Sequence, residues 1–298
     1  MPNDFAQVER FVGMAEQPAE NALACLAEQD FRDPIPGGSL SSTFARLLTE
    51  HVPAKARERR NRKRTKSMNL GTAAHAHALG AGPELIVWQY DGRTKDGKAE
   101  RAAVADLIAS EAAVAVTQRE RDQILGMAEA LRSHAIVRNI LEQSQAEVSA
   151  FWREGPIWAR ARYDLLDDLG AHDYKTTEDC SQRGFGKAMA SWGYHQQADF
   201  YERALKALNH PAAGTRLRFI CQETEAPYLV QIHTPDEEAM AVAEALNDRA
   251  IRIYAECMES GVWPGYESLV SEPTQLPPFY FYDKEDALGV PADVELKL

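Results

Sequence analysis

The chain has 298 residues, of which 45% are hydrophobic, and a formal net charge of −12. This length allows one large domain or two small ones with a full hydrophobic core. No stretch approaches the ~20 consecutive apolar residues of a transmembrane helix. The first residues also lack the basic and apolar regions of a secretory signal. We therefore expect a cytoplasmic protein with no membrane partner.

The N-terminal part of the chain is predicted to be helical. Residues 1–34 have the periodicity of one or two amphipathic helices, and their strongest apolar run is Asn21–Ala27. Prolines and glycines then interrupt the pattern. The hydroxyl side chains of Ser41–Thr43 can cap a helix that runs to about His51.

A basic strip follows this region. Between Lys55 and Lys66, eight of twelve residues are basic and only Glu58 is acidic. Because the rest of the chain is acidic, the strip concentrates positive charge in one place. Such a strip is suited to binding DNA. The alternative is a solvated basic helix without a partner.

The middle of the chain is predicted to be mostly helical. Ser67–Leu79 has a helical pattern rich in small residues, and a short strand is expected near Leu85–Gln89. From about Lys98 to Gln145 the composition is rich in Ala, Glu and Leu with helical periodicity. We expect two or three helices there.

The hydrophobic period then changes to that of strands. Three short strand-like segments are separated by turn residues, namely Glu147–Arg153, Ile157–Leu166 and Ala171–Thr176. A hairpin that continues into a third strand is therefore predicted.

The last third of the chain alternates between the two patterns. Ser181–Leu208 predicts a helix broken at one of its glycines, and Arg216–Gln222 and Tyr228–His233 predict two strands. Thr234–Glu237 has the form of a capping box with proline at the first helical position, which predicts a helix that runs to Ser260.

These elements predict an α/β fold with a mixed central β-sheet flanked by helices and an N-terminal helical region. We expect residues 1–66 to form that helical region and the basic strip, packed on the core. Residues 67–266 would form the core, and residues 267–298 an aromatic-rich tail. One structural domain is expected overall.

Asp164, Asp173 and Lys175 form the most informative pattern. Two carboxylates nine residues apart, on neighbouring short strands, can bind a divalent cation. Side chains alternate along a strand, so Lys175 lies on the same face as Asp173. The backbone carbonyl of Tyr174 is available as a further ligand. The pattern indicates metal-dependent phosphodiester hydrolysis, with Lys175 orienting water or offsetting phosphate charge; the alternative is a solvated strand edge.

His75 strengthens this interpretation. It follows Gly71 on a predicted helix whose small residues allow a close approach to the sheet. A histidine that faces a carboxylate-bound metal is a suitable additional ligand. The alternative is a core or capping histidine. His77 points to a different face of the helix, so we interpret it as structural.

Tyr194, Gln197 and Tyr201 provide a third element. Their spacing places them on one helical face. Such a row can donate hydrogen bonds to a DNA phosphate or to the nucleophile, and the alternative is a half-buried helix.

Four motifs in this order resemble those of the PD-(D/E)XK nuclease superfamily. The likeness is greatest to the RecE-type phage exonuclease branch, which is related to the RecB-like nuclease domains, and it covers roughly residues 39–266. The motifs are Gly71-Thr-Ala-Ala-His75, Arg162-Tyr-Asp164, Asp173-Tyr-Lys175 and Tyr194-His-Gln-Gln197-Ala-Asp-Phe-Tyr201.

The resemblance implies a restriction-endonuclease-like core and a 5′-to-3′ exonuclease that acts on the ends of double-stranded DNA. Such an enzyme leaves a 3′ single strand for recombination by a single-strand annealing protein, in a bacterial or phage-infected cytoplasm. It uses one or two Mg²⁺ or Mn²⁺ ions. The implied metal ligands are His75, Asp164, Asp173 and the Tyr174 carbonyl, with Glu147 as a further candidate. The implied catalytic residues are Lys175, Asp164, Asp173, Gln197 and Tyr201.

DNA contacts are expected from the basic strip and from residues near the strands. The candidates are Arg59, Arg60, Arg62, Lys63, Arg64, Arg160, Arg162 and Tyr194. Relatives of this type often form rings that thread the duplex, so a homo-oligomeric ring with a basic channel would reconcile the acidic charge with DNA binding. The long N-terminal extension of some relatives is lacking here, which leaves ring formation and processivity open.

Two other functions stay open at this point. The same scaffold can carry a restriction-like or structure-specific endonuclease, since specificity depends on loops and quaternary structure. It can also serve as a non-catalytic DNA-binding recombination protein, although the intact acidic residues and lysine argue against that.

The four cysteines predict no further cofactor. Cys25, Cys180, Cys221 and Cys257 show no CxxC spacing, which excludes the usual structural zinc and disulfide patterns. Some nucleases of this type hold an iron–sulfur cluster with three closely grouped cysteines. Here the last three are spread over residues 180–257, so we expect no cluster and mostly buried, reduced thiols.

Overall fold

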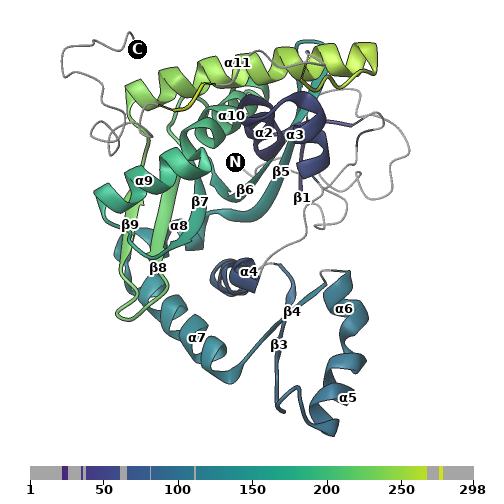
Figure 1. Cartoon of the computed structure of the whole chain (residues 1–298). Helices are drawn as coiled ribbons and strands as arrows, with labels where there is room; N and C mark the ends of the chain where they lie inside the picture. The colour runs from purple at the N-terminus through teal and green to yellow at the C-terminus, as the bar shows by residue number, and fades with distance from the viewer. Residues whose placement is uncertain are drawn as a thin grey trace, which may run out of the picture.

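The computed structural model describes residues 22–25, 35, 38–60, 66–80, 82–110, 112–266 and 275–277. The main strands are β1 (Ala22–Cys25), β2 (Leu40–Ser41), β5 (Gln145–Glu154), β6 (Ile157–Asp167), β7 (Gly170–Thr177), β8 (Arg218–Glu223) and β9 (Val230–His233). They form one seven-stranded sheet in the order β1-β5-β6-β7-β8-β9 (Figure 1), and β2 pairs with β6.

This sheet is mixed. The pairs β5–β6, β6–β7 and β8–β9 are antiparallel, whereas β7–β8 and β2–β6 are parallel. The predicted α/β fold class with a mixed central sheet is therefore confirmed.

Helices cover both faces of the sheet. The first group is α2 (Ser42–Glu50), α3 (Pro53–Arg59), α9 (Gln182–Trp192), α10 (Tyr194–Ala207) and α11 (Glu237–Ser260). Their apolar side chains form the largest core cluster with the inward faces of β5 to β8. The second group is α4 (Lys66–Leu79), α7 (Gln118–Ser133) and α8 (Ala135–Gln143), which pack on the opposite face. Figure 1 shows the two groups on either side of the strands.

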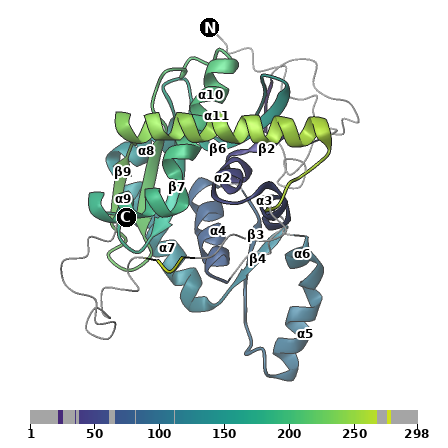
Figure 2. The same ribbon diagram turned by 45° about the horizontal axis from the view of Figure 1, so that its top comes forward.

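A small lobe interrupts the second group. It contains β3 (Glu84–Val87), α5 (Lys95–Ala103), α6 (Ala105–Ala109) and β4 (Ala113–Val116), and its two strands pair in parallel. Val114 and Val116 of β4 pack against α4 and α7. The helices α5 and α6 extend away from the main sheet in both Figure 1 and Figure 2.

Most predicted elements are confirmed, and three details are wrong. Ala22–Cys25 is a strand, not part of a helix, because it pairs with the edge of β5. The segment predicted as helices between Lys98 and Gln145 also contains β4, which is too short to override the surrounding helical pattern. Helix α11 begins after Asp236, whose side chain caps Ala239, and so it begins two residues later than predicted. The rest of residues 1–34 and most of the tail lie outside the described residues. The division of the chain at residues 66 and 266 stays a prediction.

None of the helices in the described part of the chain is long and apolar enough to cross a membrane.

The break between α9 and α10 is set by one glycine. Gly193 has a φ of 68°, in the left-handed region that ends many helices. The α10 helix restarts immediately at Tyr194. A Cβ atom at Gly193 would lie 2.5 Å from Cδ of Arg46, so α2 approaches this junction closely.

We predict that Gly193→Ala lowers the free energy of unfolding by roughly 1–2 kcal/mol, because alanine resists a left-handed conformation. The matched control is Gly186→Ala in the interior of α9, where an added Cβ meets nothing within 4 Å. That change should raise the free energy of unfolding by roughly 1 kcal/mol through helix propensity. Urea unfolding measures both, and equal effects would contradict this account.

Candidate active site

The site begins where the β5–β6 ladder opens. Residues pair in register on both sides, from Ala146↔Leu165 to Val148↔Tyr163, but the ladder omits Glu147 and Asp164 between them. Glu147 has a φ of 59°, which is rare for a residue with a side chain and costs roughly 1 kcal/mol or more. Both omitted residues carry carboxylates.

The opening also changes which face each strand presents. Strict alternation would place Tyr163 and Leu165 on the same face of the sheet. Instead Tyr163 packs in the largest core, and Leu165 packs on the opposite face with α8. On β5, Val148 and Ala146 differ in the same way. Both strands therefore turn over at the position of the two carboxylates.

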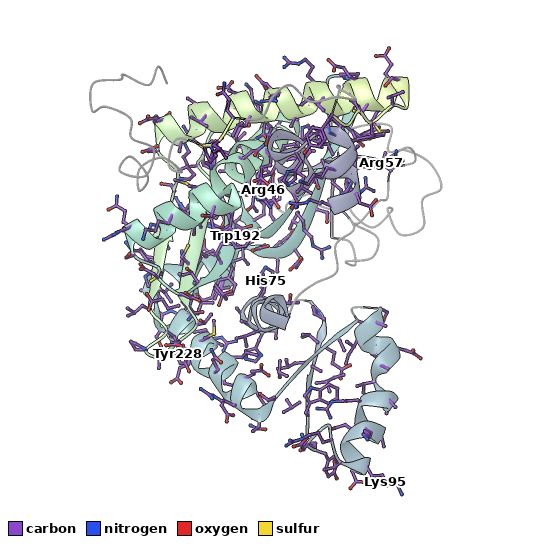
Figure 3. All side chains as sticks on the ribbon, viewed as in Figure 1. Arg46, Arg57, His75, Lys95, Trp192 and Tyr228 are labelled. Atoms are coloured by element: carbon purple, nitrogen blue, oxygen red, sulfur yellow. The ribbon has the colours of Figure 1, made fainter. Side chains whose placement is uncertain are left out.

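Helix α4 places His75 over this opening. The approach is close, since a Cβ atom at Gly71 would lie 3.3 Å from the hydroxyl of Thr176 on β7. Nε2 of His75 lies 2.9 Å from Oδ2 of Asp164, and its Nδ1 lies 3.4 Å from Oε1 of Glu147. Figure 3 shows His75 on the side of α4 that faces the sheet.

These three side chains suit a divalent cation. One ligand atom from each of His75, Glu147 and Asp164 lies within 4.8 Å of the others. Two carboxylates and an imidazole are a donor set that Mg²⁺ or Mn²⁺ accepts. The chemistry of these residues therefore fits a divalent-metal site. The group contains Glu147, which the sequence indicates only as a further candidate, and it does not contain Asp173, whose role as a ligand stays a prediction.

Asp173 and Lys175 lie beside this group on β7. The β6–β7 ladder ends at Leu165↔His172, so Asp164 and Asp173 are the next residues on the two strands. Nζ of Lys175 is 2.5 Å from Oδ2 of Asp173. Nε2 of Gln197, on α10, donates to the other oxygen of Asp173 at 2.6 Å. Asp173 is thus held by a cation and an amide, outside the three-residue ligand group.

Tyr174 links the two halves of the site. Its backbone N–H donates to Oδ2 of Asp164 at 2.7 Å, so the strand itself orients that carboxylate. Its hydroxyl donates to Gln222 at 2.6 Å, and the Gln222 amide donates to the carbonyl of Met127 on α7. The role of the Tyr174 carbonyl as a metal ligand stays a prediction.

The tyrosines of α10 pack close to Lys175 and Gln197. The amine of Lys175 lies 5.0 Å from the ring centre of Tyr194. Tyr201 is buried against the ring of Tyr163, at 5.1 Å between centres, and its carbonyl accepts from the Tyr163 hydroxyl. Burial raises the pKa of both Tyr194 and Tyr201, so both hydroxyls stay protonated at neutral pH.

The carboxylates set the protonation of the site. Burial lowers the pKa of His75, but Asp164, Glu147 and Asp173 outweigh it and raise that pKa to about 9. Burial raises the pKa of Asp173 to about 6, against the opposing effect of Lys175. Burial lowers the pKa of Lys175, yet the Asp173 and Asp164 carboxylates raise it overall, so the amine stays charged.

Comparison with known protein families decides the relationship. Residues 41–271 match the model of a PDDEXK-like domain of unknown function (DUF3799). The chain belongs to this family. The predicted resemblance to the PD-(D/E)XK superfamily is therefore confirmed at the level of the superfamily.

Two solved structures resemble this PDDEXK-like protein. A Eubacterium rectale protein named "Putative exonuclease" aligns with a TM-score of 0.53 and 10% identity, over 80% of this chain and 91% of that one. At that identity the likeness shows the fold alone. The structure of SSO0001 aligns with a TM-score of only 0.26 and 13% identity, over 69% of this chain and 99% of that one. No curated protein sequence matches the chain.

The predicted DNA contacts of this PDDEXK-like protein fall in different places. Arg160 is only 7% exposed and donates to the hydroxyl and carbonyl of Ser39, so burial argues against the phosphate contact predicted for it. Arg162 pairs with Glu147 at the edge of the metal site. Arg59, at the end of α3, contacts His51, which caps the end of α2, and Arg60 lies over the ring of Phe44. Three further candidates lie outside the described residues, namely Arg62, Lys63 and Arg64.

Sequence reasoning missed two features of the site. It assigned Arg162 to DNA and not to Glu147, because a pairing of side chains across two strands depends on their register. It also missed the Tyr174 amide as a partner of Asp164. The hydrophobic pattern gives no signal for either, although the Arg162-Tyr-Asp164 and Asp173-Tyr-Lys175 motifs contain all the residues concerned except Glu147.

We predict that His75→Gln weakens Mn²⁺ binding at least roughly tenfold, because it removes one ligand of three. The matched control is His77→Gln, since His77 is on the same helix but belongs to no group of potential ligands among the described residues. Isothermal titration calorimetry measures both affinities. Equal affinities in the two variants would place the metal elsewhere.

We also predict that Mn²⁺ affinity rises with pH between 7 and 9. Imidazole binds a metal only when neutral, and His75 holds a proton up to a pKa of about 9 in the metal-free protein. The ion therefore competes with a proton below that pH. Calorimetry at pH 7, 8 and 9 measures the slope, which should become shallower in His75→Gln; an unchanged slope would contradict the assignment.

Proposed function

We propose that the protein is a divalent-metal-dependent exonuclease that hydrolyses phosphodiester bonds from the ends of double-stranded DNA, from 5′ to 3′. Its family and fold support a nuclease. The observation that carries the proposal is the charged amine of Lys175, fixed on Asp173 next to the ligand group of His75, Glu147 and Asp164.

In this proposal one histidine and two acidic residues hold the metal. His75, Glu147 and Asp164 are the ligands, and Asp173 is the candidate for a further contact. A bound Mg²⁺ or Mn²⁺ supplies the Lewis acidity that phosphodiester hydrolysis requires. Arg162 keeps Glu147 turned toward the site through their ion pair.

Lys175 acts as a cation and not as a base. Its pKa is raised by the two aspartates, so the amine has no free electron pair at neutral pH. It can donate hydrogen bonds to a phosphate oxygen and offset the charge that develops there. Gln197 keeps the Asp173 carboxylate in place for this contact, and Tyr201 packs behind Gln197.

DNA is proposed as the substrate because basic residues gather on α3. Lys55, Arg57 and Arg60 are exposed there, and the continuation of the basic strip follows directly in the sequence. A homo-oligomeric ring would surround the duplex with several such strips and so overcome the net charge of −12. The motif resemblance is the support for three finer parts of the proposal, namely the 5′-to-3′ polarity, the RecE-like role and the annealing partner.

The test compares linear duplex DNA with a closed circle of the same sequence, in Mg²⁺ and in Mn²⁺. End-labelled linear DNA should lose nucleotides progressively from its 5′ ends, and the circle should stay intact. Cutting of the closed circle would contradict the exonuclease proposal and indicate an endonuclease that uses the same site. Binding without cleavage in either metal would favour a non-catalytic recombination protein.

We predict that Lys175→Ala reduces cleavage of linear DNA at least roughly a hundredfold, because the charge facing the phosphate is lost. The matched control is Lys98→Ala, which removes an exposed lysine from the lobe and should leave the rate unchanged. Since Lys175 is paired with Asp173, circular dichroism should first show that the variant is folded. A parental rate in folded Lys175→Ala would remove this lysine from the mechanism.

A further inference from the structure

Trp192 has an exposure that its helix position does not predict. Phe185, Met189 and Trp192 follow one another at the i, i+4, i+7 spacing of a single helix face. Phe185 is 5% exposed and packs in the main core, and Met189 packs against the same core. Trp192 belongs to this inward face, yet it is 60% exposed. The inner face of α9 therefore ends with a large aromatic ring that no protein core covers.

The surroundings of Trp192 lead to the candidate active site. The next residue, Gly193, is in contact with the side-chain stem of Arg46 from α2. The residue after it, Tyr194, lies under the amine of Lys175. Arg46 also lies close enough to affect the pKa of Tyr194, together with Lys175 and Asp173. Figure 3 shows Arg46 and Trp192 between α2 and His75 in that view.

Arg46 adds positive charge at this position. Its guanidinium pairs with Glu50 one turn along α2, at 2.9 Å, and remains partly exposed. An exposed ion pair of this kind contributes little to stability, so it is easily exchanged for a stronger partner such as a phosphate.

We propose that Trp192 and Arg46 form a nucleotide-binding subsite beside the catalytic lysine. Trp192 stacks on a base of the DNA strand next to the scissile phosphate, and Arg46 contacts an adjoining phosphate. The inference rests on the proposed nuclease function and extends it to substrate positioning. Stacking on an aromatic ring is independent of base identity, which suits an enzyme that degrades any sequence.

Binding is tested in EDTA, so that no cleavage occurs, with a duplex that carries 2-aminopurine near one 5′ end. The parental protein should bind and change the 2-aminopurine fluorescence on stacking. Trp192→Ala should weaken binding roughly tenfold and abolish the fluorescence change. Trp192→Phe should restore most of both. Arg46→Ala should weaken binding and reduce the slope of log affinity against log salt by about one.

The matched control is Tyr90→Ala, which removes another exposed aromatic residue, in the lobe. It should bind as the parental protein does. Parental affinity in Trp192→Ala, or an equal loss in Tyr90→Ala, would overturn the subsite. Circular dichroism should be unchanged in Trp192→Ala, Trp192→Phe and Tyr90→Ala, because the replaced rings are exposed.

Cleavage in Mg²⁺ or Mn²⁺ separates this inference from the proposed function. Trp192→Ala should raise KM and leave kcat close to the parental value. If Trp192→Ala cleaves DNA with the parental KM and binds it with the parental affinity, the subsite is overturned and the nuclease function is not. If the parental protein cleaves no DNA but its DNA binding depends on Trp192, the nuclease function is overturned and the subsite is supported.

Discussion

The contact between His75 and Asp164 is the constraint on which the candidate site depends. Asp164 Oδ2 receives both Nε2 of His75 at 2.9 Å and the Tyr174 amide at 2.7 Å. One atom therefore joins α4, β6 and β7. The contact lies where the ladder between β5 and β6 omits Glu147 and Asp164, the two carboxylates that His75 approaches.

Charge balance explains how three carboxylates lie close together in a partly buried place. Each has a cation of its own, in the pairs Glu147–Arg162, Asp164–His75 and Asp173–Lys175. Unpaired carboxylates would raise one another's pKa and bind protons instead. A metal bound at the proposed site would leave the charges of Arg162 and Lys175 in place, whereas His75 would give up its proton. Of the three cationic partners, only His75 would therefore change its charge.

The sequence predicted the sheet, the hairpin strands and the residues that meet in the site, because strand periodicity and the order of four motifs are local properties. It could not predict the turnover of β5 and β6 at Glu147 and Asp164, which follows from a single left-handed residue among strand-forming neighbours. It also could not place Arg160, since the burial of that arginine against Ser39 depends on a parallel pairing across 121 positions. The exposure of Trp192 could not be predicted for a related reason. Its position on the helix predicts burial, and the ring is uncovered only because the core ends beneath it.

The lobe between α4 and α7 packs on these two helices mainly through its strands. Val114 and Val116 seal the space between the two helices, so β4 belongs to the framework that holds His75. None of the described residues between 88 and 112 belongs to that hydrophobic cluster. This segment can therefore be shortened or replaced, we expect, while the helix that carries the histidine keeps its place.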